Sequence, residues 1–533
     1  MLKNKNILFI CKETFSVPFY FLAKELLNEN TVASYFFNPP ETGFKKCLMN
    51  ESTFYKHKEI NNLIVYDNND IVQEFTKNLK FPEIDKSYLE KIEIKYTKQK
   101  PFVQQILTSQ FFSRRFHNRT IYVSTTYEQQ IYWLQLNYKK VENIFEEFKP
   151  DYIFDLDNSE FFRSVISEVS RYKKIIYINL QHPRYEMYKI YSNSTKWENE
   201  IFKKIYFENF AKDKKALLDE YKYINEFRTK SNIMSVEWSN PKWLVDNTAN
   251  YEKDSLFKIL KNLFGKIIYD FNLNYFKGST IFKKKNKIFY PNTLKFISFF
   301  LKFEIKRWYL LGKNKYFSIP RFGEKYVYMP LHLIPESSTF VHAPYYINEI
   351  FLIEQISKSL PLGLKLYVKE HQAMLGERPL SFYKKVNSLS NVKLMQVNYY
   401  KDPKPWIVNS ECVVTITGTT AYEAALLGKP SIIFGDMPFN YISSITKISD
   451  FNDLPNFFRN LSNIENIHSC AAYIAAVKHI GNSVNLNLLM IKGEKILLGL
   501  EKIDQEFENE INNLKLFFLK SLKFIENMQC FEN

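Results

Sequence analysis

The sequence predicts an α/β protein with two domains, each built on a parallel sheet, and a helical insertion between them. The chain has 533 residues, which is more than one ordinary hydrophobic core supports. Short apolar runs alternate with helix-like patterns in two separate series, and this order is typical of parallel strands joined by helices. The stretch between the two series is charged and has no clear strand pattern.

Residues 1–194 hold the first series. Its expected strands are short apolar runs that end at turn residues, at 6–11, 31–37, 62–67, 151–156 and 174–179. Helical patterns separate some of these runs, at 18–27, 126–148 and 159–172. We therefore expect a first domain whose parallel sheet is covered by helices on both faces.

Residues 195–325 form the expected helix-rich insertion and linker, and they end in a strongly basic segment. Residues 277–325 contain thirteen Lys and Arg residues against two acids, Glu304 and Glu324. Lysines and aromatic residues recur there at helical spacing. Such a segment can lie on an anionic membrane surface, or it can be an interdomain helix whose lysines are solvated. Nucleic acid is not expected as a partner, because no recognisable binding module accompanies the charge.

Residues 326–481 hold the second series, which predicts the second domain. Its expected strands lie at 326–331, 364–369, 392–396, 411–416 and 431–434. Its expected helices lie at 345–360, 380–389, 403–409 and 421–427. The tail, residues 482–533, has a largely helical pattern, and we expect its helices to pack back on the first domain.

Cysteine usage and hydropathy exclude several classes of protein. The five cysteines are scattered and odd in number, so neither a disulfide framework nor a metal site is predicted. The N-terminus does not have the pattern of a signal peptide, and no apolar run approaches the ~20 residues that span a bilayer. We expect a cytoplasmic protein, soluble or peripheral at the inner face of the membrane, with no metal and no cofactor.

Polar residues follow two strands of the second series, at the edge where the carboxyl ends of parallel strands meet. Lys369, Glu370 and His371 come at the end of one apolar run, and His371 can donate to a phosphate oxygen or act as a general acid. Glu336 follows another strand and can bind a sugar hydroxyl or act in catalysis. A solvated loop or a simple turn is the alternative for each group.

A third polar cluster joins the strand at 411–416 to the next helix. Gly418 lets the backbone turn tightly between Thr417 and Thr419, and free amides at the start of the helix attract an anion. Glu423 lies in the first turn, where it can accept hydrogen bonds from ribose hydroxyls or merely complement the helix dipole. The clusters together predict an anion and ribose pocket.

Six short strings of the second series resemble the capsule polysaccharide biosynthesis family in their order and spacing. They are YMPLH at 328–332, PESST at 335–339, LYVKEH at 366–371, RPLSFY at 378–383, TITGT at 415–419 and EAALLGKP at 423–430. The resemblance covers residues 326–436 and implies a GT-B-like fold, in which two Rossmann-like domains face a cleft. It implies sugar transfer from a nucleotide-sugar co-substrate, with CMP-linked acidic sugars such as Kdo as donors of related members, and no bound metal.

The resemblance also implies roles for individual residues. His371 would contact the donor phosphate, and Glu423 would hold the ribose. The residues that would complete the donor pocket are Lys369, Thr417, Gly418 and Thr419. Gln372 stands where the family has the proline of a His-Pro pair, so the donor nucleotide stays open. A His-Pro pair does occur at 182–183, and we interpret it as an unrelated loop.

The catalytic acid or base on the acceptor side is expected from the first domain. Asp155 and Asp157 at the end of one strand are the candidates, together with Glu13 after another, although each can be a loop or capping acid. We expect a glycosyltransferase that acts on a growing glycan, lipid-linked or free. A nucleotide-sugar epimerase and a non-catalytic factor for polysaccharide assembly, transport or export are the alternatives.

Overall fold

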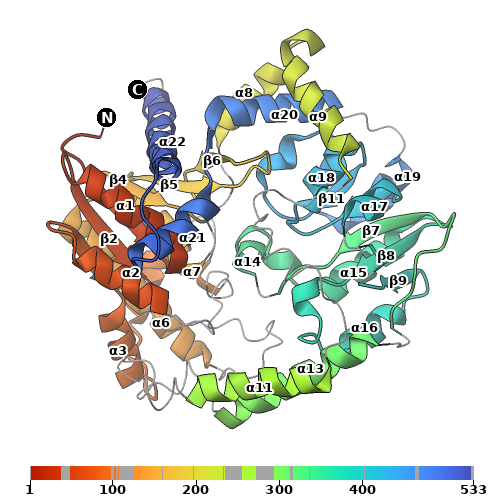
Figure 1. The fold of residues 1–533 in the computed structure, drawn as a ribbon, viewed down its shortest axis with the longest axis horizontal. Coiled ribbons are helices and arrows are strands. Elements are labelled where there is room, and N and C mark those ends of the chain that lie inside the picture. The colour runs from red at the N-terminus through yellow and green to blue at the C-terminus, as the bar shows by residue number, and fades with distance from the viewer. Residues whose placement is uncertain are drawn as a thin grey trace.

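The computed structural model contains two sheets, one of seven strands and one of six (Figure 1). Because each sheet is built mainly from parallel strands with helices between them, the predicted α/β class with two Rossmann-like domains is confirmed. The structure describes residues 2–37, 48–97, 101–103, 106, 125–158, 160–195, 197, 199–231, 233, 255–271, 293–312, 316–334, 336–397, 399–400, 402–461 and 467–529.

The first sheet has the strand order β13-β6-β5-β4-β1-β2-β3. Its parallel strands are β1 (Asn6–Cys11), β2 (Thr31–Phe36), β3 (Ile64–Asp67), β4 (Tyr152–Asp155) and β5 (Ile176–Gln181). Two antiparallel strands extend it, β6 (Tyr188–Ser192) and β13 (Asn482–Ser483). Strand order reverses between the neighbours β1 and β4, which makes their carboxyl ends the switch point of this sheet.

Helices cover both faces of the first sheet. They are α1 (Ser16–Leu26), α2 (Leu48–Lys58), α3 (Asn69–Lys77), α4 (Lys86–Tyr96), α6 (Tyr127–Phe148) and α7 (Phe161–Tyr172). The longest, α6, begins at a capping box in which Thr126 and Gln129 satisfy each other's backbone amides. It ends at Lys149, which adopts a left-handed conformation before Pro150.

The second sheet is parallel throughout, in the order β12-β11-β10-β7-β8-β9. Its strands are β7 (Tyr326–Pro330), β8 (Lys365–Lys369), β9 (Val392–Met395), β10 (Cys412–Val414), β11 (Ser431–Ile433) and β12 (Ile445–Lys447). The helices around it are α14 (Ser337–His342), α15 (Glu349–Ser359), α16 (Leu380–Asn387), α17 (Lys404–Val408), α18 (Thr420–Leu426) and α19 (Leu454–Arg459). The switch point of this sheet lies between β7 and β10.

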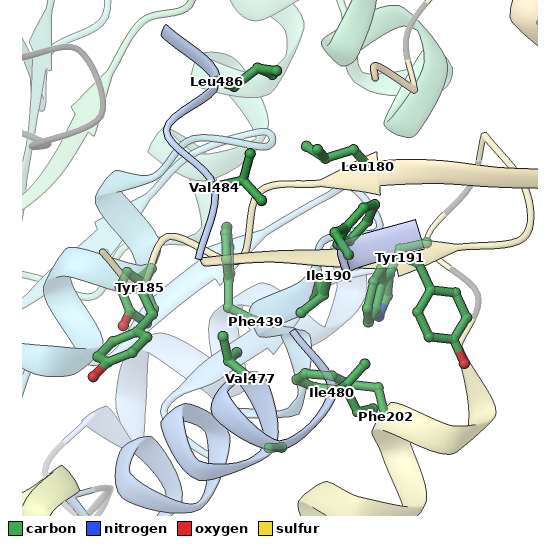
Figure 2. Packing of buried hydrophobic residues seen from close by; sticks show 14 of the residues in the cluster. Leu180, Tyr185, Ile190, Tyr191, Phe202, Phe439, Val477, Ile480, Val484 and Leu486 are labelled. Atoms are coloured by element: carbon green, nitrogen blue, oxygen red, sulfur yellow. The ribbon is translucent and has the colours of Figure 1, made fainter. Parts of the chain in front are cut away.

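Three helices join the two sheets into one core, and they are α8 (Glu200–Phe210), α9 (Leu218–Thr229) and α20 (Ile467–Ile480). Figure 2 shows Phe202 of α8 near Val477 and Ile480 of α20, with Leu180 of β5 and Phe439 of the second domain in the same cluster. Polar contacts reinforce this packing. The Tyr206 hydroxyl lies 2.8 Å from Ser469 Oγ, and Arg228 Nε donates to the Leu426 carbonyl at 2.7 Å.

The last two helices, α21 (Leu486–Leu497) and α22 (Gln505–Gln529), pack against the first domain. Phe518 of α22 stacks on Phe154 of β4 with ring centroids 4.1 Å apart. The Tyr152 hydroxyl donates to Glu526 of α22 at 2.8 Å. The chain therefore returns to the first sheet after it has completed the second.

Helices α11 (Leu256–Phe271) and α13 (Thr293–Leu311) pack on each other and lie along one rim of the molecule (Figure 1). Leu310 of α13 is buried in the core of the second domain. None of the helices in the described part of the chain has the length and apolar character that crossing a bilayer requires.

Candidate functional site

His332 follows β7 and lies at the switch point of the second sheet. Its Nε2 accepts a hydrogen bond from the Ile416 amide at 3.0 Å and lies 2.9 Å from the Thr415 hydroxyl, both just beyond β10. Burial, together with the nearby His371 and Arg378, lowers the pKa of His332 to about 3. The ring is therefore neutral at pH 7 and fastens β7 to β10 where the two strands end.

A buried ion-pair network centred on Arg378 holds His332 in place. Its guanidinium contacts Glu349 of α15 at 2.6 Å and Glu370 after β8 at 2.9 Å, and it donates to the His332 carbonyl at 2.8 Å. The Tyr383 hydroxyl of α16 donates to Glu370 at 2.8 Å. Each carboxylate pairs with the guanidinium, so each charge in the network has an opposite charge beside it. A charge buried alone would be costly. The network fixes the ends of two strands and two helices relative to each other.

His371 lies next to this network and has a defined proton position. Its Nδ1 accepts a hydrogen bond from the Ala373 amide at 3.2 Å, so the neutral ring carries its proton on Nε2. Burial and the neighbouring Arg378 lower the pKa of His371 to about 4. Nε2 makes no hydrogen bond with any residue that the structure describes. At pH 7 His371 thus offers one neutral N–H donor, which suits a phosphate oxygen.

Lys369 is the last residue of β8, and its side chain is held on the other side of the strand from Glu370. Its ammonium donates to the Tyr400 carbonyl at 2.7 Å and lies 5.4 Å from the centre of the Trp406 ring. Burial lowers the pKa of Lys369 to about 8. An ammonium has three N–H donors, so this contact leaves two of them for another acceptor.

In the loop from β10 to α18, Gly418 lies very close to the Thr415 side chain. A Cβ at this position would lie 2.4 Å from Thr415 Oγ1, so only glycine fits without a shift of the loop. The Gly418 amide donates to the same oxygen at 3.2 Å. Thr417 is buried, with its hydroxyl 3.5 Å from that of Thr339 in α14. Thr419 precedes α18, and its side chain does not cap the helix.

Glu423 lies in the first turn of α18 and is half-buried. Its carboxylate makes no hydrogen bond and no salt bridge with the described residues. Burial and the nearby Asp402 raise the pKa of Glu423 to about 7, while Arg184 of the first domain acts in the opposite direction. A carboxylate without a partner among the described residues can accept hydrogen bonds from hydroxyl donors.

Arg184 is a residue that the sequence reading missed. It follows the His-Pro pair at 182–183, which we had interpreted as an unrelated loop. The Tyr473 hydroxyl of α20 donates to the Pro183 carbonyl at 2.8 Å, and this bond holds the loop against the helix. The loop thereby carries a guanidinium of the first domain close enough to Glu423 to act on its charge. Only the tertiary contact reveals this, because the two residues lie far apart in sequence.

The two aspartates proposed for the first domain lie at the switch point of the first sheet. Both Asp155 oxygens accept from Arg163 Nε at 2.9 Å, and the Tyr177 hydroxyl donates to one of them at 2.9 Å. Burial raises the pKa of Asp155 to about 6. Asp157 lies 3.2 Å from Arg163 Nη1, and its side chain is 22% exposed. Of the two, Asp157 is the one that a substrate can reach.

Glu336 immediately precedes α14, and its side chain does not cap that helix. Thr339 of the same helix contacts Thr417, so α14 connects Glu336 to the β10–α18 loop. The structure thus gathers the second-domain candidates around the carboxyl ends of β7, β8 and β10. Asp155 and Asp157 lie instead at the equivalent edge of the other sheet, where Arg163 pairs with them.

Comparison with known proteins finds likeness only among solved structures, since no family model and no curated protein matches the chain. A β-Kdo 2,7-transferase, KpsC of Thermosulfurimonas dismutans, is 10% identical with a TM-score of 0.28, over 63% of this chain and 79% of that one. The UDP complex of S. aureus MnaA is 10% identical with a TM-score of 0.26, over 94% and 98%. A UDP-N-acetylglucosamine 2-epimerase of Listeria monocytogenes, described as putative, is 10% identical with a TM-score of 0.26, over 89% and 91%. At these values the activities of those proteins do not transfer to this chain, and a functional proposal rests on the residues of its own site.

Proposed function

We propose that the protein is a glycosyltransferase of capsule or surface polysaccharide biosynthesis, which moves a sugar from a nucleotide-activated donor to a growing glycan. The observation that carries the proposal is the pair of open polar groups at the switch point of the second sheet. His371 presents a neutral N–H donor, and Glu423 presents a carboxylate without a protein partner. A nucleotide sugar has phosphate acceptors and ribose hydroxyl donors that match these two groups. The family resemblance of residues 326–436 agrees with this assignment.

In this proposal the second domain binds the donor. His371 Nε2–H donates to a phosphate oxygen and stabilises the charge that develops there as the sugar leaves. Thr417, Gly418 and Thr419 line the nucleotide, while Glu423 accepts from the ribose. Lys369 adds positive charge, which would favour an acidic sugar such as a CMP-linked one.

The acceptor is a glycan, lipid-linked or free, that approaches from the first domain. Glu336 and Asp157 are the candidates for the acid or base that acts on it, because their side chains are not fully buried. Asp155 holds Arg163 in place and would act through that contact. No metal takes part in this scheme.

Calorimetric titration of the protein with CMP, UDP and GDP tests the donor site. We expect one of the three to bind, and His371→Ala and Glu423→Ala each to weaken that binding at least about tenfold, since a hydrogen bond to a charged group contributes about 1.5–3 kcal/mol. His479→Ala and Asp453→Ala change an exposed histidine and an exposed acid of the same half of the chain, and they serve as matched controls. Absence of binding to all three nucleotides would contradict the proposal.

Incubation of the bound nucleotide's sugar conjugates without any acceptor separates transfer from epimerisation. A transferase leaves the donor unchanged apart from slow hydrolysis, whereas an epimerase produces a second nucleotide sugar. The appearance of an epimer would replace the proposed reaction but keep the donor site.

A further inference from the structure

Helix α11 has one face of large apolar side chains that is exposed to solvent. Its residues occupy positions three or four apart and fall within an arc of about 120° around the helix axis. The exposed fractions range from 46% to 79% for Leu256, Phe257, Leu260, Phe264 and Ile268. The opposite side contributes Ile259, which is buried. An exposed apolar stripe of this size on a folded protein marks an interaction surface.

Helix α13, which packs against α11, has an exposed apolar face of its own. The large side chains on that face are between 37% and 75% exposed, and they are Leu294, Leu301, Ile305, Trp308 and Tyr309. They also share one arc of the helix, about 100° wide. Each of the two helices thus has an exposed apolar face, and the helices lie next to each other along one rim of the molecule (Figure 1).

The inner face of α13 is already occupied by the second domain. Lys306 Nζ donates to the carbonyl oxygens of Glu377 and Arg378 at 3.1 and 3.3 Å. The helix approaches Gly376 so closely that a Cβ there would lie 2.9 Å from Arg307 Cβ. Helix α13 is thus fixed to the loop that follows His371.

The charge on the exposed faces of α11 and α13 indicates what their partner is. Exposed lysines border the apolar stripes, Lys261 on α11 and Lys295 and Lys302 on α13. The acid of α13, Glu304, is buried. Apolar side chains bordered by lysines fit the acyl chains and the negative headgroups of a lipid bilayer. A symmetric contact between two copies would instead set lysines against lysines.

We propose that α11 and α13 form a docking surface for an anionic membrane. The apolar side chains of both helices enter the headgroup region, and Lys261, Lys295 and Lys302 contact acidic lipids. This inference goes beyond the proposed function and does not depend on it, since it concerns a surface that is separate from the donor site. In combination with that function, it would hold the His371 loop beside the bilayer, where a lipid-linked acceptor is found.

Vesicle flotation of the full-length protein without nucleotide tests this surface. We expect binding to vesicles of phosphatidylcholine with phosphatidylglycerol, weaker binding at high salt, and little binding to phosphatidylcholine alone. Replacing two exposed apolar residues in Leu260→Glu/Phe264→Glu should reduce partitioning at least about tenfold, because each buried side chain is worth more than 1 kcal/mol. Lys261→Gln/Lys302→Gln should reduce it about 25-fold, at about fivefold for each lysine.

The matched control is Phe81→Glu/Ile94→Glu, which changes two apolar residues of the first domain that are even more exposed. It should bind vesicles as the unmodified protein does, and circular dichroism should show that all variants are folded. Equal binding to both kinds of vesicle, or unchanged binding of Leu260→Glu/Phe264→Glu, would overturn the proposal. A dimer in light scattering that Leu260→Glu/Phe264→Glu dissociates would also overturn it, because a second copy would then cover this face.

Discussion

At the scale of single residues, burial produces three different outcomes around the second switch point. His332 stays neutral and links two strands through an acceptor nitrogen. His371 also stays neutral, but its protonated nitrogen has no acceptor among the described residues, so it can serve a ligand. Glu423 is held with a pKa of about 7, where its charge responds to pH and to whatever binds beside it. A residue's partner, rather than its type, decides which role it takes.

Glu423 gives the donor site a predictable pH dependence. Burial raises the pKa of its carboxyl from 4.5 to about 7, so the free protein holds it protonated below pH 7 and ionised above. If ribose hydroxyls donate to the ionised form, affinity should rise about tenfold per pH unit up to pH 7 and then level off. Titration calorimetry between pH 5.5 and 7.5 with a nucleotide sugar checks this, because its phosphodiester does not titrate in that range.

Glu423→Gln keeps the shape of the side chain and removes its charge, so its affinity should be weak and flat across the same pH range. His371 and Lys369 do not interfere, because the pKa of His371, about 4, lies below the window and that of Lys369, about 8, lies above it. An equally steep pH profile in Glu423→Gln would show that another group controls binding.

At the scale of elements, the Arg378 network connects β7, β8, α15 and α16. Arg378→Met would leave Glu349 and Glu370 buried without their cation, and we expect it to lower the free energy of unfolding by about 3–5 kcal/mol. Urea denaturation followed by circular dichroism measures this. Lys203→Met breaks an exposed pair of the same kind, with Glu200, and should cost no more than about 1 kcal/mol.

The triple variant Arg378→Met/Glu349→Gln/Glu370→Gln also removes the two carboxylate charges that Arg378→Met leaves unpaired. It should therefore recover part of the lost stability. A loss for Arg378→Met that is as small as that for Lys203→Met would mean that the network does not hold these elements together.

The elements differ in how well the sequence predicts them. The strands that became β1, β7 and β8 are buried apolar runs bounded by turn residues, and such a pattern is visible locally. The strands β6, β12 and β13 were not predicted, because their residues do not form an apolar run and they gain strand geometry from a partner strand. The site residues also differ in how well the sequence predicts them. The polar groups at strand ends could be proposed from position, whereas the role of Arg184 depends on a contact between domains.

At the scale of the whole molecule, the chain crosses between the two sheets more than once. Each crossing adds hydrophobic contacts to the core. Helix α20 packs on α8 and α9, while α22 closes the core of the first sheet. The domains therefore share hydrophobic core, and we expect them to unfold together rather than one after the other. The donor site should then be lost in the same transition as the first domain, although its residues belong to the second.

Phe518 of α22 tests this coupling. It is 1% exposed and stacks on Phe154, so Phe518→Ala opens a cavity against the first sheet and should cost about 3–5 kcal/mol. Leu516→Ala changes a 53% exposed residue of the same helix and should stay within about 0.5 kcal/mol of the unmodified protein. Urea denaturation is followed by circular dichroism for the fold and by nucleotide binding for the donor site. In Phe518→Ala both midpoints should shift downward by the same amount, because loss of the first-domain core removes support for α20 as well. A binding midpoint that stays at its original urea concentration would show that the second domain stands independently of the helix that follows it.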